Sequence, residues 1–319
     1  MKYYLGIDGG GTKTACLLVD ETGNFLAESL TKGCSYLELG VENAAEYLME
    51  GVKSCLAQAG IALDMLSGAG IGLPCLGENQ QSDARILGML REQFAGAPVC
   101  IVNDVEAGWA GSLGMEPGIN IVSGTGSIAF GKNQSGESKR SGGWSTFFGD
   151  EGSCYWLGRR AMELFAKQAD GRVPRGRLYD IVRETLSLEQ DTDFIARMEE
   201  EYIPLRSKTA SFQKVLLLAA RQGDESAKSL YREAAEELGL MAESIARPLF
   251  GGEKVMVSYS GGLFHGKELA LPVLEQSIRR WNGQLVEPLF SPVQGAVLLG
   301  ACQEGKAQME QIRENWNNN

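Results

Sequence analysis

The feature that most constrains the fold is a strand, a glycine turn and a second strand, which occur in this order twice in the 319 residues. The first copy comprises Tyr3–Ile7, the turn Asp8–Thr14, Thr14–Val19, a polar turn and a third strand Phe25–Leu30. The second copy begins after Gly118 and comprises Ile119–Val122, the turn Ser123–Ser127 and Ile128–Gly131. Two β-rich beginnings, each followed by helices, predict two related α/β halves that meet near residues 113–118.

The remaining elements are predicted from the spacing of apolar residues and from turn residues. Helices are expected at Val41–Ala59, Ser82–Phe94, after Asp104, Tyr155–Ala169, Phe212–Arg221, Ala227–Leu249 and Pro292–Cys302. Further strands are expected at Ser67–Leu73, Pro98–Val102 and Lys254–Ser258. We therefore expect domains at residues 1–115 and 116–305. A C-terminal helix and tail at 306–319 is expected to pack back on the first domain.

Charge and cysteine content exclude several classes of function. The chain has 30 basic and 41 acidic residues, a net charge of −11, which disfavours nucleic acid and anionic membrane surfaces as partners. Its seven cysteines are scattered and form no CxxC pair, so neither a disulfide framework nor a zinc site is indicated. Free cysteines, no signal-peptide pattern and no long apolar run lead us to expect a cytoplasmic protein.

The first glycine turn has the composition of a phosphate-binding loop. It is not a Walker A sequence, and it leads into a strand rather than a helix. The backbone amides of a glycine turn can still point into one concavity and bind phosphate there. A threonine hydroxyl adds a hydrogen-bond donor, and a lysine adds a positive charge. The residues expected to contact phosphate are Gly10, Gly11, Thr12 and Lys13. Asp8 ends the first strand, where its carboxylate could hold Mg²⁺ through water; an ordinary hairpin is the alternative.

The second glycine turn repeats this composition with Gly124, Thr125, Gly126 and Ser127. One such turn after a buried strand is common in hairpins. Two of them at corresponding places favour a shared role, in which two loops facing each other grip the phosphates of a nucleotide.

In this order, the motifs make the chain similar to the actin/hexokinase/Hsp70-type ATPases. It most resembles the BadF/BadG/BcrA/BcrD family, which includes N-acetylglucosamine kinases. The motifs are DGGGTKT, Asn103-Asp104 after a strand, SGTGS, Gly142-Gly143-Trp144, Gly149–Ser153, Ser260-Gly261-Gly262 and Gly295-Ala296. The resemblance implies an α/β fold with two ribonuclease H-like (actin-like ATPase) domains around a central cleft.

The resemblance also implies roles for individual residues. Asp104 matches the general base that takes a proton from a sugar hydroxyl, although an Asp between a strand and a helix is also a common N-cap. Asn103, Gly142, Gly143 and Asp150 match substrate-binding positions. For Asp150 an N-cap is again the alternative. Adenosine-binding positions match Gly261 and Gly262, with Ala220 beside the adenine; a simple turn is the alternative for the glycines.

One position departs from the N-acetylglucosamine kinase pattern, because Ser35 stands where those kinases carry an asparagine. Serine is shorter and reaches differently, so three amino sugars stay open: N-acetylglucosamine, glucosamine and N-acetylmuramic acid.

The resemblance thus implies an ATP-dependent kinase that uses Mg²⁺ and phosphorylates the 6-hydroxyl of an amino sugar. Homodimers are frequent among such kinases, so a homodimer is a further expectation. The alternatives are an ATPase that activates a dehydratase or reductase, and a non-catalytic sugar sensor on the same fold.

Overall fold

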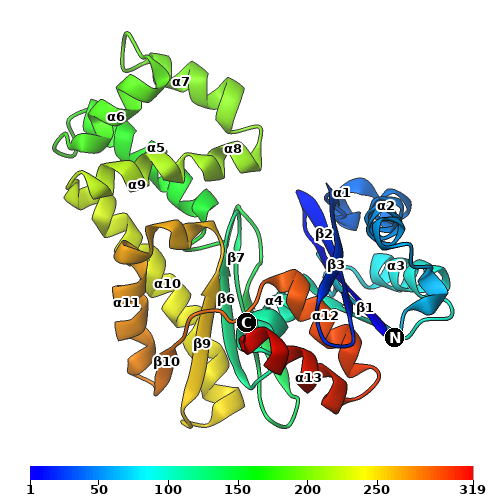
Figure 1. Ribbon diagram of the computed structural model, residues 1–319. Helices are drawn as coiled ribbons and strands as arrows, with labels where there is room; N and C mark the ends of the chain where they lie inside the picture. The colour runs from blue at the N-terminus through cyan, green and yellow to red at the C-terminus, as the bar shows by residue number, and fades with distance from the viewer. Residues whose placement is uncertain (319) are drawn as a thin grey trace. The chain divides into compact units, whose positions relative to one another are not determined.

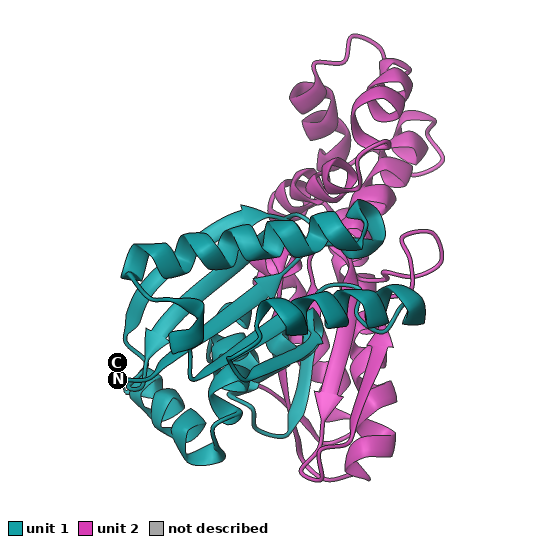
Figure 2. Cartoon of the chain, turned by 90° about the vertical axis from the view of Figure 1, so that its right-hand side faces the viewer, with its two compact units in different colours: residues 1–120, 287–319 teal, residues 121–286 magenta. Residues whose placement is uncertain are grey.

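The computed structural model describes residues 1–318, which form two compact units. Unit 1 contains residues 1–120 and 287–319, and unit 2 contains residues 121–286 (Figure 2). Each unit is built on one five-stranded sheet.

The sheet of unit 1 has the strand order β3-β2-β1-β4-β5. Its strands are β1 (Tyr3–Gly9), β2 (Lys13–Asp20), β3 (Phe25–Lys32), β4 (Gly68–Leu73) and β5 (Val99–Asn103). Neighbours β1–β2 and β2–β3 are antiparallel, whereas β1–β4 and β4–β5 are parallel. The carboxyl ends of β1, β4 and β5 therefore lie at one edge of the sheet.

Helices cover both faces of this sheet. They are α1 (Tyr36–Leu39), α2 (Val41–Ala59), the 3₁₀ turn η1 (Leu63–Met65), α3 (Gln80–Gln93), α4 (Asp104–Leu113), α12 (Pro292–Cys302) and α13 (Lys306–Asn317). Leu5 and Ile7 face a core made largely by α2 and α3. Tyr4 faces the opposite side, where it packs with residues of α12 and α13. This alternation is the period-two pattern of a strand buried on both faces.

Helix α12 belongs to unit 1, although the expected division placed residues 116–305 together. The physical reason is close packing of glycines. A Cβ atom at Gly295 would lie 2.2 Å from the carbonyl oxygen of Ala107, and one at Gly70 would lie 2.0 Å from that of Ala296. The backbone of α12 can therefore approach α4 and the sheet directly.

Helix α13 also lies in unit 1, against the turn between β2 and β3. Side chains of α13 donate hydrogen bonds to three consecutive carbonyl oxygens of that turn. The bonds are Gln308 to Glu21 (2.7 Å), Asn315 to Thr22 (2.9 Å) and Trp316 to Gly23 (2.7 Å). The C-terminal helix is thereby attached to the first strands of the chain.

The sheet of unit 2 repeats the topology of the first sheet. Its strands are β6 (Gly118–Ser123), β7 (Ser127–Lys132), β8 (Ser138–Gly142), β9 (Val255–Ser260) and β10 (Gly283–Leu285). Their order is β10-β9-β6-β7-β8, which is β8-β7-β6-β9-β10 when read from the other edge. In both sheets the strands then follow one another as the third, second, first, fourth and fifth strand of the unit. The common order confirms the two related halves predicted from the repeated glycine turns.

Unit 2 has more helices than unit 1. They are α5 (Cys154–Ala169), α6 (Arg177–Leu186), α7 (Asp193–Arg197), the π-helical turn η2 (Met198–Tyr202), α8 (Arg206–Ser211), α9 (Gln213–Arg221), α10 (Glu225–Phe250), the 3₁₀ turn η3 (Gly262–Gly266) and α11 (Lys267–Arg279). The long helix α10 packs on β7 and β8 and against α11. Helices α5 to α9 form a separate helical group in the same unit (Figure 1).

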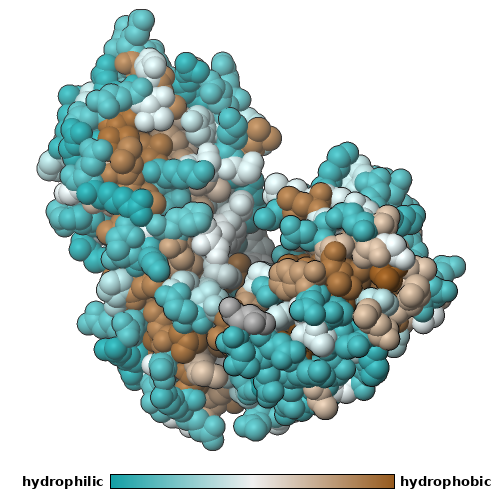
Figure 3. Space-filling model, viewed as in Figure 1, coloured by the Kyte–Doolittle hydropathy of each residue, from teal (hydrophilic) through white to brown (hydrophobic). Residues whose placement is uncertain are grey.

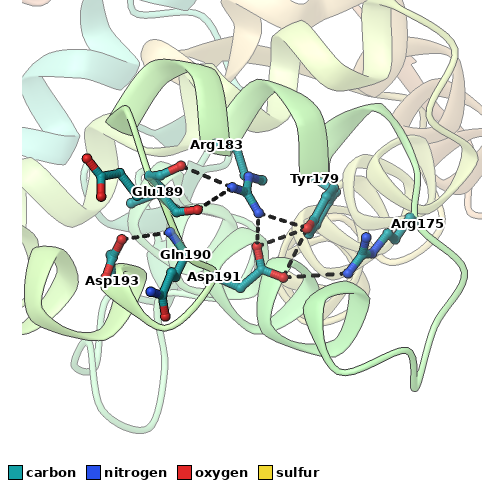
Figure 4. Close-up of polar contacts among 8 residues, drawn as sticks. Arg175, Tyr179, Arg183, Glu189, Gln190, Asp191 and Asp193 are labelled. Atoms are coloured by element: carbon teal, nitrogen blue, oxygen red, sulfur yellow. Dashed lines mark hydrogen bonds and ion pairs between the residues drawn. The ribbon is translucent and has the colours of Figure 1, made fainter.

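The connection between α6 and α7 is fixed by Asp191 (Figure 4). Its carboxylate accepts a hydrogen bond from the Tyr179 hydroxyl at 2.9 Å and forms ion pairs with Arg183 (2.6 Å) and Arg175 (3.5 Å). Arg183 also donates to the carbonyl oxygen of Glu189 at 2.8 Å. All of these contacts join residues of the helical group to one another. They stabilise the connection between α6 and α7, and a structural role explains them.

On the face drawn in Figure 3, hydrophilic residues cover most of the surface and hydrophobic residues form separate patches. Throughout residues 1–318, the helices lack an apolar stretch long enough to cross a membrane.

Candidate functional site

In unit 1, the two predicted carboxylates lie at the carboxyl ends of parallel strands. Asp8 is paired with Gly72 in the register of β1 and β4, and Leu73 is paired with Asn103 in the register of β4 and β5. Asp104 follows at once as the first residue of α4. In open α/β sheets this edge is where ligands bind.

Burial perturbs the pKa of both carboxyl groups. Burial raises the pKa of Asp8 to about 7; the neighbouring Asp104 adds to this effect and Lys13 opposes it. Burial likewise raises the pKa of Asp104 to about 6. Backbone amides at the start of α4 counteract that shift, whereas the negative charge of Glu78 adds to it. Two carboxyl groups with raised pKa values at one sheet edge are typical of a functional site.

The first glycine turn is fixed by backbone hydrogen bonds on both sides. Gly10 donates to the carbonyl oxygen of Lys13 at 2.9 Å, and Cys34 donates to that of Gly10 at 3.0 Å. At Gly11, however, an added Cβ would meet no atom within 4 Å, and no left-handed φ requires glycine there. The protein's own packing therefore leaves open space beside the backbone at Gly11.

The cap of α4 is Asn103 rather than Asp104. The Asn103 side-chain oxygen accepts the backbone N–H of Val105 at 3.1 Å, and its amide nitrogen donates to the carbonyl oxygen of Leu76 at 2.7 Å. The capping role weighed for Asp104 is thus performed by its neighbour. One N–H of the Asn103 amide is still available to a ligand.

Ser35 is buried, and its hydroxyl lies 3.5 Å from the thiol of Cys75. Cys75 has a left-handed backbone conformation, with φ of 66°. The adjacent Tyr36 hydroxyl donates to Asp83 at 2.5 Å, and Asp83 also accepts the backbone N–H of Gly77 at 3.1 Å. Ser35 and Cys75 therefore meet where the segment after β3 touches the loop after β4, and sequence spacing alone did not identify Cys75.

In unit 2, the second glycine turn lies against the Ser260-Gly261-Gly262 turn and the start of α5. The N–H of Cys154, the first residue of α5, donates to the carbonyl oxygen of Gly124 at 2.8 Å. A Cβ atom at Gly261 would lie 2.3 Å from the carbonyl oxygen of Ser123. At Gly124 an added Cβ would meet no atom within 4 Å, as at Gly11. The two segments expected to contact ATP in this unit are thus adjacent.

Asp150 lies beside the same turn. One carboxylate oxygen accepts the backbone N–H of Ser127 at 3.2 Å, and the other forms an ion pair with Arg206 at 2.7 Å. The residue that caps α5 is Ser153, which accepts the N–H of Trp156 at 3.0 Å. Asp150 is therefore not the N-cap of α5, which was the alternative considered for it.

The glycine pair before Asp150 also contacts Ser127. Gly142 and Gly143 have φ values of 79° and 68°, which favour glycine. The N–H of Gly143 donates to the carbonyl oxygen of Ser127 at 2.9 Å. The structure therefore places both expected sugar-binding glycines next to the second glycine turn.

Ala220, expected beside the adenine, is 1% exposed and lies near the C-terminal end of α9. In the loop between Gly143 and Gly149 the sequence analysis singled out only Trp144, yet three aromatic side chains are exposed: Trp144 (73%), Phe147 (90%) and Phe148 (70%). Aromatic residues clustered between glycines were the available signal. Arg206 was also missed, because nothing local in the sequence distinguishes it from the other arginines.

Comparisons with known proteins identify the family. The family model of the BadF/BadG/BcrA/BcrD ATPase family matches residues 5–300. An N-acetylmuramic acid/N-acetylglucosamine kinase of Clostridium acetobutylicum is 32% identical over 83% of this chain and 86% of its own length. An N-acetyl-D-glucosamine kinase of Dictyostelium discoideum is 29% identical over 93% of this chain and 97% of its own.

Among solved structures, one from Chromobacterium violaceum, described as a candidate N-acetylglucosamine kinase, has a TM-score of 0.74 and 28% identity. It covers 94% of this chain and 99% of that one. The likeness confirms the expected fold class, α/β with two actin-like ATPase domains. On its sequence and its fold, the chain belongs to the BadF/BadG/BcrA/BcrD ATPase family.

Proposed function

We propose that this protein is an ATP-dependent sugar kinase that transfers the γ-phosphoryl group of ATP to the 6-hydroxyl of an amino sugar. The observation that carries the proposal is the position of Asp104. Its carboxyl group follows the carboxyl end of β5, its pKa is raised by burial, and its charge acts on Asp8 near the end of β1, the strand that leads into the first glycine turn. The kinase names of the Clostridium and Dictyostelium relatives support the same reaction class.

Asp104 would act as the general base. With a pKa of about 6, its carboxylate is mostly ionised at neutral pH, yet it is a stronger base than an ordinary aspartate. It would accept the proton of the sugar hydroxyl as that oxygen attacks the γ-phosphorus, while the bond from phosphorus to the bridging oxygen of ADP breaks. General-base catalysis of this kind typically contributes ~10²–10⁴-fold.

The two glycine turns would bind the phosphate groups. The proposed residues are Gly10, Gly11, Thr12 and Lys13 in unit 1, and Gly124, Thr125, Gly126, Ser127, Gly261 and Gly262 in unit 2. Gly11 and Gly124 support this role because each leaves open space where a side chain would stand. Phosphoryl transfer depends mainly on alignment and charge neutralisation, which backbone amides and Lys13 supply.

Asp8 is the residue that would hold Mg²⁺, through water. Its carboxyl group has a pKa raised by burial and by Asp104, so a cation beside it would favour the ionised form. When bound, the ion would neutralise negative charge on the phosphates.

The sugar would be bound by Ser35, Asn103, Gly142, Gly143 and Asp150. Ser35 and its neighbour Cys75 form a small, weakly polar wall. N-acetylglucosamine, glucosamine and N-acetylmuramic acid are the candidates to compare.

The test is ADP release from Mg-ATP with these three sugars, and with glucose as an acceptor that lacks the amino group. We expect turnover with at least one amino sugar. Asp104→Asn should lower kcat by at least about 10²-fold while nucleotide binding persists. Near-normal turnover of Asp104→Asn would contradict the assignment of the base, and no turnover with any amino sugar would contradict the proposed function.

A further inference from the structure

Arg206 places a positive charge directly on the second glycine turn. Its Nη2 atom lies 2.7 Å from Oδ2 of Asp150, and the same atom would lie 2.7 Å from a Cβ added at Gly126. The Asp150 side chain is 5% exposed, whereas the Arg206 side chain is 50% exposed. The guanidinium group thus lies at the surface of the turn, with much of it in solvent.

The backbone contacts of α8 hold Arg206 in this place. Arg206 is the first residue of α8, and α8 packs on α5 where Gly158 lets the helices approach: a Cβ there would lie 2.0 Å from the carbonyl oxygen of Thr209. The first amide of α5 in turn bonds to Gly124. The π-helical turn η2 precedes α8, and such turns are frequent at functional sites.

The ion pair competes with the role proposed for Asp150. One of its carboxylate oxygens already accepts the N–H of Ser127, and the other is paired with Arg206. A sugar hydroxyl that donates to Asp150 must therefore share or take the oxygen that Arg206 occupies. Because Asp150 is buried, the exchange requires the sugar hydroxyl to replace the guanidinium group at that oxygen, whereas the half-exposed Arg206 side chain can remain in solvent.

We propose that Arg206 is a phosphate-binding residue that leaves Asp150 when the sugar binds and then contacts the nucleotide phosphates at the second glycine turn. This inference rests on the proposed kinase function. The guanidinium group fits because its planar set of donors matches phosphate oxygens, and because a chain of net charge −11 has to supply cations locally to bind a triphosphate. Sugar binding and nucleotide binding are then coupled through one side chain.

A purely structural role for Arg206 predicts the opposite result for sugar affinity. If Arg206 only holds Asp150 in position, Arg206→Ala weakens sugar binding and leaves nucleotide binding unchanged. If the sugar instead displaces Arg206 from Asp150, the Arg206→Ala variant binds sugar as tightly as the wild type or several-fold more tightly. It then loses about tenfold or more in affinity for a non-hydrolysable ATP analogue with sugar present, and kcat falls by about 10²-fold or more.

The experiment is calorimetric titration of the full chain with sugar, and with the analogue in the presence and absence of sugar, together with steady-state kinetics. Arg206→Lys, which keeps the charge but not the fork, should recover part of the analogue affinity. Arg197→Ala is the matched control, because Arg197 is a half-exposed arginine in an ion pair with Glu201 in the same helical group. It should match the wild type in every measurement.

A second set of variants tests the exchange without any sugar. Asp150→Asn removes the ion pair but keeps an oxygen for the Ser127 N–H, so it should tighten analogue binding several-fold. The gain should vanish in the double variant Asp150→Asn/Arg206→Ala. Unchanged analogue affinity in Asp150→Asn would overturn the inference. This arm remains decisive even if none of the amino sugars is phosphorylated, a result that would contradict only the proposed function.

Discussion

Oδ1 of Asp150 accepts a hydrogen bond from the backbone N–H of Ser127 at 3.2 Å. A residue proposed to bind the sugar is therefore bonded to the turn proposed to bind ATP, within one unit. Since Gly143 also donates to the Ser127 carbonyl oxygen, both backbone polar groups of Ser127 are used to align the two segments. In unit 1, the negative charge of Asp104 acts on Asp8 and helps to raise the pKa of that carboxyl group.

Gly124→Ala should weaken nucleotide binding without destabilising the fold. The added methyl group meets nothing in the free protein, so the Tm should stay within about 2 °C of the wild type. A phosphate close to the backbone would meet that methyl group, and the KM for ATP should rise about tenfold or more.

The matched variant is Gly261→Ala, at a position with φ of 107° where the methyl group would clash with the Ser123 carbonyl oxygen. It should lower the Tm clearly. Unchanged ATP affinity in a well-folded Gly124→Ala would show that the turn does not approach phosphate.

The pH dependence of turnover should show the ionisation of Asp104. A base must be deprotonated, so kcat/KM for the sugar should rise with pH through about 6 and level off above it. Glu78→Gln removes a negative charge that raises this pKa, and should therefore move the rise to lower pH. A pH profile that is flat between 5 and 7 would argue against Asp104 as the base.

Asp8→Asn should stabilise the protein in the absence of ligands at alkaline pH. The folded-state pKa of Asp8 is about 7, well above the ordinary value near 3.8, so the folded state binds the proton more tightly than the unfolded state. The Asp8 contribution to stability is therefore greatest below pH 4 and is lost as pH rises to about 7. Asparagine has no such penalty.

Thermal unfolding measures this difference. At pH 8 the Tm of Asp8→Asn should exceed that of the wild type by a few degrees, and the two should converge near pH 4. Turnover with Mg-ATP should be lost. A lower Tm of the variant at pH 8 would show that the ionised carboxylate is compensated in the free protein.

Asp224→Ala should destabilise unit 2, because this buried carboxylate caps two helices at once. It accepts the N–H of Ala227 in α10 at 3.0 Å and that of Leu178 in α6 at 2.9 Å. Loss of two buried acceptors should cost about 2–4 kcal/mol in the free energy of unfolding, measured by urea denaturation.

A single-cap variant provides the comparison. Asn79→Ala removes one exposed cap, at the start of α3, and should cost only about 1 kcal/mol. An equal effect of the two variants would mean that the second hydrogen bond of Asp224 adds no stability.

Local signals predicted many of the elements well. Helix α2 has the bounds expected from its apolar spacing, since Gly60 ends it in a left-handed conformation. Helix α12 also has its expected bounds, because Pro292 follows the capping Ser291, whose partner Gln294 completes the capping box. Helices α7 and α8, of five and six residues, were missed because so short a segment shows no clear period.

The sequence by itself determined the two related α/β halves, the glycine turns and the carboxylates at strand ends, because these depend on period, turn chemistry and residue order. Only the tertiary structure decided that residues 287–305 belong to unit 1, that Asn103 rather than Asp104 caps α4, and that Arg206 pairs with Asp150 across 56 positions. Those contacts depend on the path of the chain and on glycines that let backbones meet, and no local pattern encodes either.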